Sequence, residues 1–104
     1  MHMNELYNIL QNWSFFKTMC AQDPESEEKR RKIGLKILAY LQTEEGLAGM
    51  IQHYSIIGLD LIESRLFPLL SEIAKDCGDT MSYTKIQTGI GKSLLEILNN
   101  VTPI

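Results

Sequence analysis

The chain has 104 residues, of which 44% are hydrophobic and 22% charged, enough for one globular domain with its own core. Ten Lys and Arg against thirteen Asp and Glu give a net charge of -3, which excludes a strong overall attraction to nucleic acid or to an anionic membrane. No apolar run approaches the ~18 residues of a membrane helix, and no secretory signal pattern opens the chain. We expect a cytoplasmic or nuclear protein.

Helical periodicity runs along the chain, and no strand pattern is present. A first helix is predicted over residues 1–22. Asp23 and Pro24 then indicate a stop and a new helix start. The basic run 29–32 follows acidic residues at spacings of four, which is typical of a solvated, self-neutralising face rather than a phosphate-binding patch. The pairs expected on this face are Glu25 with Lys29, Glu27 with Arg31, and Glu28 with Lys32. Gly46 is predicted to end the second helix.

The next segments are predicted from their glycine and proline positions. A short helix is expected over residues 47–57, with Gly58 as its end. Asp60 is predicted to cap the following helix. Pro68 should kink or break that helix near Phe67, because a proline inside a helix costs about 3 kcal/mol or more.

The last third of the chain contains the most apolar helix. Gly78 is predicted to end the preceding helix, and residues 79–88 to hold at most a short one. The final helix should follow Gly89 and fray near Asn100. Its apolar residues cover so much of its circumference that we expect packing on at least two sides. They are Ile86, Ile90, Leu94, Leu95, Ile97 and Leu98. These patterns predict an all-α fold with this helix at its centre.

A spacing pattern occurs twice in the chain. It runs from Gly46 to Tyr54 and again from Gly89 to Ile97. Each copy begins with a glycine and an aliphatic residue, has a second aliphatic residue four positions after the first, and ends with an apolar residue three positions later. The interval contains a short helix, a long helix and a partly helical connection, which is the order of an armadillo repeat unit. Residues 46–100 therefore resemble armadillo repeats.

This resemblance implies a short right-handed stack of armadillo-like helices within a single domain spanning residues 1–104. The stack would hold about two units, residues 24–57 and 60–100, with residues 1–22 as the capping helix. A compact helical bundle is the alternative fold.

The resemblance also implies a non-enzymatic adaptor or scaffold fragment that binds a protein partner. Armadillo units that bind peptides present a Trp and an Asn from the long helix. The matching positions here hold Pro68 and Glu72 in one unit and Lys36 and Tyr40 in the other, so the asparagine ladder is absent. A partner surface on the long helices is predicted to use Lys36, Tyr40, Arg65 and Glu72 instead.

A second partner surface is predicted on the final helix. Stacked helical units leave apolar end faces, and no polar cap follows the final helix. We therefore expect self-association, or a partner helix, to cover Ile90, Leu94 and Ile97.

A small helix-turn-helix regulator using residues 82–100 is the alternative function. Residues 88–90 would be its tight turn, and Lys92 to Asn99 would face the DNA major groove. The acidic balance and Glu96 on that face oppose nucleic-acid binding. Gly89 to Ser93 resembles the end of a phosphate-binding loop, but the spacing requires a glycine where Ile86 stands.

The sequence predicts no catalytic, metal or cofactor site. His2 and His53 are the only histidines, Cys20 and Cys77 are the only cysteines, and no two of these four stand at metal-ligand spacing. We therefore expect a protein that is not an enzyme.

Overall fold

The computed structural model describes residues 3–101, and within that range it is all-α, as predicted. Its elements are α1 (Met3–Gln11), α2 (Trp13–Cys20), α3 (Pro24–Tyr40), α4 (Glu44–Ile57), a π-helical turn η1 (Ile62–Leu66), α5 (Phe67–Cys77) and α6 (Thr80–Val101). The ends of the expected 1–104 domain, residues 1–2 and 102–104, lie outside the described residues. None of the helices described is both long enough and apolar enough to cross a membrane.

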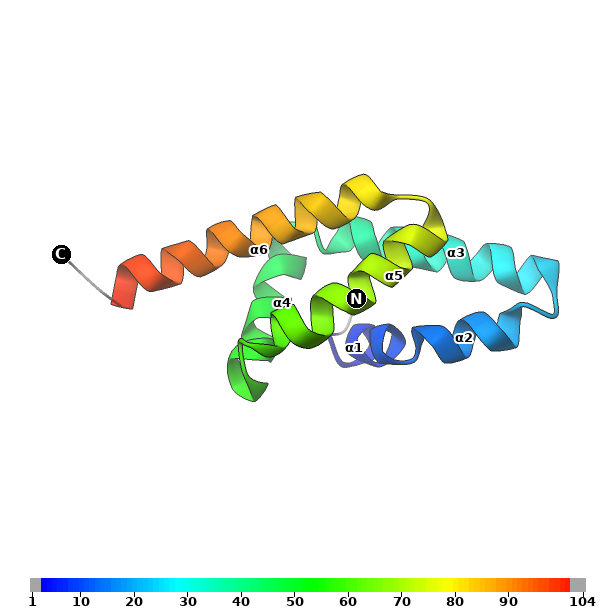
Figure 1. Ribbon diagram of the computed structural model, residues 1–104, viewed down its shortest axis with the longest axis horizontal. Helices are drawn as coiled ribbons and strands as arrows, with labels where there is room; N and C mark the ends of the chain where they lie inside the picture. The colour runs from blue at the N-terminus through cyan, green and yellow to red at the C-terminus, as the bar shows by residue number, and fades with distance from the viewer. Residues whose placement is uncertain (1–2, 102–104) are drawn as a thin grey trace.

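The fold is built from helical hairpins, which are pairs of consecutive helices joined by a short turn, and these hairpins pack against one another (Figure 1). In Figure 1, α2 and α3 run side by side, and α3 also contacts α5 and α6. The hairpin of α5 and α6 closes at Gly78, whose left-handed backbone (φ 71°) ends α5 as predicted. From that turn the two helices splay apart, so that their far ends are separated. This divergence positions the groove described below.

The core gathers one apolar stripe from each helix. Its members are Leu6, Leu10, Trp13, Ile37, Leu38, Leu41, Met50, Tyr54, Ile62, Leu66, Leu70, Ile73, Ala74, Ile86 and Ile90. Burial of about 1.5–3 kcal/mol per large apolar side chain makes this cluster the main favourable contribution to folding. The armadillo-like stack and its division at residues 24–57 and 60–100 remain predictions.

Two glycines that were expected at helix ends lie inside helices, so those predicted boundaries are wrong. Gly46 belongs to the first turn of α4, where the Thr43 hydroxyl accepts a hydrogen bond from its backbone N–H at 3.1 Å. A Cβ atom on Gly46 would stand 2.1 Å from the carbonyl oxygen of Tyr40. The glycine therefore permits the close approach of α4 to the end of α3.

Gly89 lies in the middle of α6, which continues from Thr80 to Val101 without a break. A Cβ atom there would stand 2.9 Å from Leu47 Cδ1, so this glycine brings α6 against α4. The expected short helix over residues 79–88 is therefore wrong. The tight turn expected at residues 88–90 for a helix-turn-helix is also absent, because these residues are helical.

Near Phe67, where Pro68 was expected to kink or break the helix, the structure has a π-helical turn, and residues 61–77 stay helical without a break. Because proline has no backbone N–H, the ladder of hydrogen bonds is interrupted there. The Phe67 N–H donates to the Ile62 carbonyl, five residues back, and α5 begins at Phe67. Asp60 caps nothing by its side chain, since Leu61 holds the cap position of η1, so that prediction is wrong.

The last turns of α6 extend beyond the body of the molecule (Figure 1). Residues 91–101, here called the α6 arm, are exposed except for Ser93 and Leu94, which are partly buried. The expected packing of this helix on two sides therefore fails beyond Ile90. The face of α6 that packs in the core up to Ile90 continues along the arm, where no other helix of the described residues covers it.

Candidate functional site

A buried ion-pair cluster joins α2, α3 and α5. Arg30 is 4% exposed and donates hydrogen bonds to Glu27 and to Asp76, whose side chain is 6% exposed. Trp13 Nε1 donates to the same Asp76 carboxylate at 3.1 Å, and the Arg30 guanidinium lies 4.8 Å from the centre of the Trp13 ring. Lys17 adds a longer contact of 3.7 Å to Asp76. The cluster is a structural junction with its charges compensated.

Both buried partners remain charged. Burial alone would favour the neutral form of Asp76, but the hydrogen bond from Arg30 outweighs it and holds the pKa of Asp76 below its usual range. Burial likewise disfavours charged Arg30, but Glu27 and Asp76 raise the pKa of its guanidinium. The junction thus contains no group prepared to exchange a proton near neutral pH.

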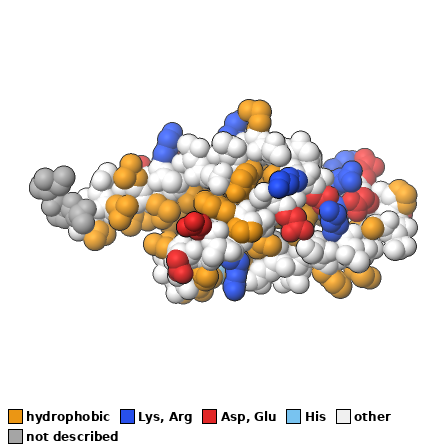
Figure 2. Space-filling view, in the orientation of Figure 1, with side chains coloured by type: hydrophobic (Ala, Val, Ile, Leu, Met, Phe, Trp, Pro, Cys, Tyr) orange, Lys and Arg blue, Asp and Glu red, His pale blue; other side chains and the backbone are white. Residues whose placement is uncertain are grey.

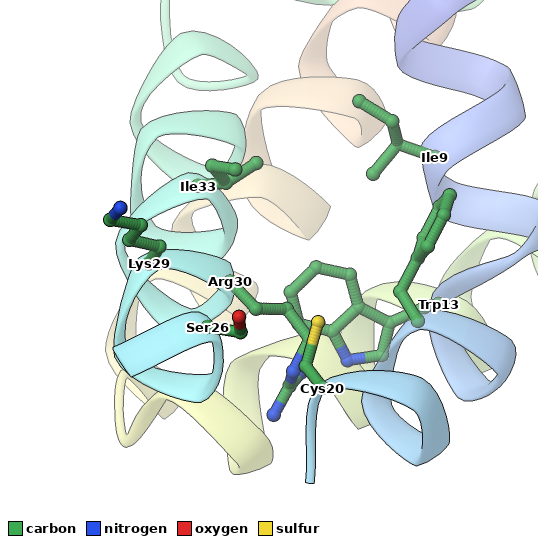
Figure 3. A pocket seen from close by; sticks show the side chains of 8 residues that line it. Ile9, Trp13, Cys20, Ser26, Lys29, Arg30 and Ile33 are labelled. Carbon is green, nitrogen blue, oxygen red and sulfur yellow. The ribbon is translucent and has the colours of Figure 1, made fainter. Parts of the chain in front are cut away.

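A pocket of about 340 Å³ lies above this junction, between α3 on one side and α1 and α2 on the other (Figure 3). We call it the Trp13 pocket. It is lined by Ile9, Trp13, Phe16, Cys20, Ser26, Lys29, Arg30 and Ile33. The Ser26 hydroxyl donates to Asp23 at 2.7 Å, and Lys29 pairs with Glu25 at 3.2 Å. The pocket therefore offers apolar contact, but its Ser, Lys and Arg side chains already have partners within the chain.

A larger groove opens where α5 and α6 diverge. It has a volume of about 760 Å³, which lies in the range of about 300–1,000 Å³ common for binding clefts. We call it the α5–α6 groove. Its lining residues are Leu59, Asp60, Ile62, Glu63, Phe67, Pro68, Ser71, Tyr83, Gln87, Ile90, Gly91 and Leu94. Most of these side chains are apolar, so the groove has an apolar floor.

The closed end of the groove is held by an aromatic contact between its two walls and by a hydrogen bond within the α6 wall. The rings of Phe67 and Tyr83 meet edge to face, with their centres 6.4 Å apart. Gln87 Nε2 donates to the Tyr83 hydroxyl at 3.1 Å, which fixes that side chain on the α6 wall. The other wall contains the π-helical turn, a feature that is frequent at functional sites.

One edge of the groove is acidic. Asp60 and Glu63 both line it and both are exposed. Neither has an ion-pair partner within the described residues, and no Lys or Arg lines the groove. On α3, in contrast, the expected pairs of Glu25, Glu27 and Glu28 with residues four positions later are confirmed. The groove is therefore a place where negative charge is left uncompensated.

The opposite wall contains a glycine whose side-chain space is empty. A Cβ atom on Gly91 would meet no other atom within 4 Å, although the residue lies inside a helix. No packing among the described residues explains this glycine, unlike Gly89. It leaves the α6 wall of the groove open to a large neighbouring group.

The α6 arm continues the apolar surface of the groove toward the C-terminus. Leu94 is partly buried in the groove, while Leu95, Ile97 and Val101 are exposed by 57%, 40% and 71%. Figure 2 shows hydrophobic side chains gathered over this part of the molecule, with acidic side chains beside them. A second, smaller groove runs along the other side of the arm, between α4 and residues that include Ser93 and Ile97.

The structure separates the residues predicted on the final helix. Ile90 is 1% exposed and belongs to the core, and it also lines the inner part of the α5–α6 groove. Leu94 lines the α5–α6 groove, and Ile97 lies on the groove beside α4. Sequence periodicity placed all three on one face, but that face passes from the core to the surface between Ile90 and Leu94.

The residues predicted on the long helices have different neighbours. Arg65 is exposed in a shallow depression shared with Gln11 and Asn12, and Glu72 accepts a hydrogen bond from Ser14 at 3.0 Å. Both therefore lie toward α1 and α2. Lys36 is exposed on α3, and Tyr40 packs partly against the core at the end of α3. Their role in partner binding stays a prediction.

Sequence reasoning did not find Asp60, Glu63, Phe67 or Gly91 as site residues. The signal in the sequence that could have pointed to the groove was two acids three positions apart, followed by an apolar segment with Pro68.

No group of three or more potential metal ligands lies together within residues 3–101. A scan against protein-family models matched no family, and searches of curated proteins and solved structures found no match.

Proposed function

We propose that this protein is a non-enzymatic interaction module that binds a helical segment of a partner protein in the α5–α6 groove. The groove and the α6 arm together form one elongated apolar surface, and an α-helix is the element that covers such a surface in helix-in-groove recognition. The arm adds exposed leucine and valine side chains to the contact.

The observation that carries this proposal is the continuity of the apolar stripe on α6. Over Ile86 and Ile90 this stripe is buried against the chain itself. From Leu94 onward it lies at the surface, next to a groove of about 760 Å³. Large apolar patches on a soluble domain mark interaction surfaces, because exposing them to water is unfavourable.

Gly91 provides a variant that tests this groove directly. Gly91 lines the groove, and a Cβ atom there meets no side chain or neighbouring helix of the described residues within 4 Å, so Gly91→Phe is expected to place its ring in the groove. Thr88→Phe is the matched control, since Thr88 is also exposed on α6 but lines a different depression. Both variants should keep the helical circular dichroism spectrum and the unfolding transition of the wild type.

The experiment is affinity capture from nuclease-treated extract, followed by binding measurements with each captured protein in purified form. We expect a partner that binds the wild type and Thr88→Phe equally and binds Gly91→Phe at least about tenfold more weakly, a difference of 1.4 kcal/mol. Partners that bind all three proteins equally would place the function elsewhere. The Lys36, Tyr40, Arg65 and Glu72 surface would then be tested next.

A further inference from the structure

The α5–α6 groove carries negative charge at one edge, although an apolar docking surface needs none. Asp60 and Glu63 stand three positions apart on the stretch that leads into α5, and both line the groove. Their position therefore places negative charge along one edge of an apolar floor formed in part by Ile62 and Phe67. The wall opposite, with Gly91 and Leu94, carries no charge of its own.

This edge is unlike the acidic face of α3. Glu25 and Glu28 are paired with lysines at 3.2 and 3.4 Å, so a charged partner gains little from them. Asp60 and Glu63 have no cation to compensate them among the described residues. A partner that supplies cations there would remove repulsion and gain attraction, whereas an acidic partner would add repulsion.

We propose that the segment recognised by this groove is an amphipathic helix whose apolar face is flanked by Lys or Arg. This inference rests on the proposed function of the groove as a site for a partner helix. The long side chains of Lys and Arg lie along apolar surface while their charged ends reach outward, so they can contact the groove floor and the acidic edge together. Charge thereby selects the partner, and apolar burial supplies most of the affinity.

Two synthetic helical peptides test this proposal with the full chain. They share one apolar face and differ only in their flanking residues, which are lysines in one peptide and glutamates in the other. Calorimetric titration gives the affinity of each peptide. We expect the wild type to prefer the lysine peptide by about tenfold, because exposed charge pairs each contribute a modest amount. The preference should shrink at high salt.

Charge reversal at the groove edge is the decisive variant. Asp60→Lys/Glu63→Lys should invert the preference, so that the glutamate peptide binds more tightly. The control Glu5→Lys/Glu45→Lys changes net charge by the same amount on exposed residues that lie outside both the groove and the α6 arm. It should keep the wild-type preference. Gly91→Phe should weaken both peptides.

The outcomes separate the two proposals. Equal binding of the two peptides, with loss in Gly91→Phe, would overturn charge selection and leave the groove as a helix site. Failure of both peptides to bind would overturn the inference and the proposed function of this groove together. If Gly91→Phe abolishes self-association but no peptide binds, the occupant is a second copy of the chain, and the basic partner helix is excluded.

Discussion

Arg30 donates a hydrogen bond to Asp76, a residue 46 positions later in the chain, and thereby fastens α3 to α5. Both side chains are almost completely buried, and Trp13 contacts both of them. The α5 wall of the groove is therefore anchored to the body of the protein, while the α6 wall extends beyond it.

Replacement of Asp76 by Asn should strongly destabilise the protein. The change leaves Arg30 buried with one of its two anionic partners removed, and breaking a buried ion pair typically costs about 3–5 kcal/mol. Urea unfolding at about pH 7 measures this loss. The double variant Arg30→Met/Asp76→Leu should be much closer to the wild type, because neither charge is left buried alone. A double variant as unstable as Asp76→Asn would contradict this expectation, because it would show that the ion pair stabilises the protein more than apolar packing at the same positions.

The same carboxylate predicts the pH dependence of stability. Because the pKa of Asp76 is lower in the folded protein than its ordinary value of 3.8, the unfolded chain binds the proton more readily. The contribution of Asp76 is therefore fully present above about pH 4 and is lost as the pH falls through the folded-state pKa. The difference in unfolding free energy between wild type and Asp76→Asn should shrink between about pH 5 and pH 2. A difference that stays constant over this range would mean that the Asp76 pKa is not lowered.

Two glycines on α6 should respond differently to the same substitution. Gly91→Ala should raise stability by about 0.5–1 kcal/mol, because alanine is the better helix former and its methyl group has space. Gly89→Ala has the same gain in helix propensity but brings Cβ to 2.9 Å from Leu47 Cδ1. Thermal unfolding of the two variants should therefore rank Gly91→Ala above Gly89→Ala. Equal melting temperatures would mean that Leu47 moves aside without cost.

Self-association through the α6 arm also remains a prediction. Leu95→Glu and Ile97→Glu change exposed residues, so each should leave the unfolding free energy within about 0.5 kcal/mol of the wild type. If the arm pairs with another copy, sedimentation equilibrium should show a dimer for the wild type and a monomer for the two variants. A monomeric wild type at high concentration would exclude this pairing.

The sequence was sufficient for those parts of the fold that are local. Gly58 and Gly78 end helices with positive φ angles, and Pro68 coincides with the change from the π-helical turn to α5. The charge pairs along α3 also follow from their spacing of four. In each case the outcome depends on residues within one or two turns of the chain, which a sequence pattern displays directly.

Two errors concern contacts between distant segments. Gly89 has the residue type of a helix end, but its position inside α6 is set by close approach to Leu47, which stands 42 positions earlier in the chain. Arg30 lies within a basic run that is otherwise exposed, and only its contact with Asp76 explains its burial. No local pattern contains that information.

The candidate groove could not be derived from the sequence for the same reason. Whether Asp60 and Glu63 share a wall with Phe67 depends on the π-helical turn, which shifts the phase between η1 and α5. Whether Leu94 faces a core or a groove depends on where α5 diverges from α6. The apolar stripe was visible, but the point at which it leaves the core was not.

Trp13 is the only tryptophan of the chain, and its place at the junction makes it a selective spectroscopic reporter. Its emission depends on the stacked guanidinium of Arg30, the hydrogen bond to Asp76 and an indole that is 1% exposed. None of these three side chains lines the α5–α6 groove. Emission from Trp13, excited selectively over the tyrosines, should therefore remain unchanged when the groove is filled and shift to longer wavelength when the helices separate. A single optical signal can thus distinguish occupation of the protein from its unfolding.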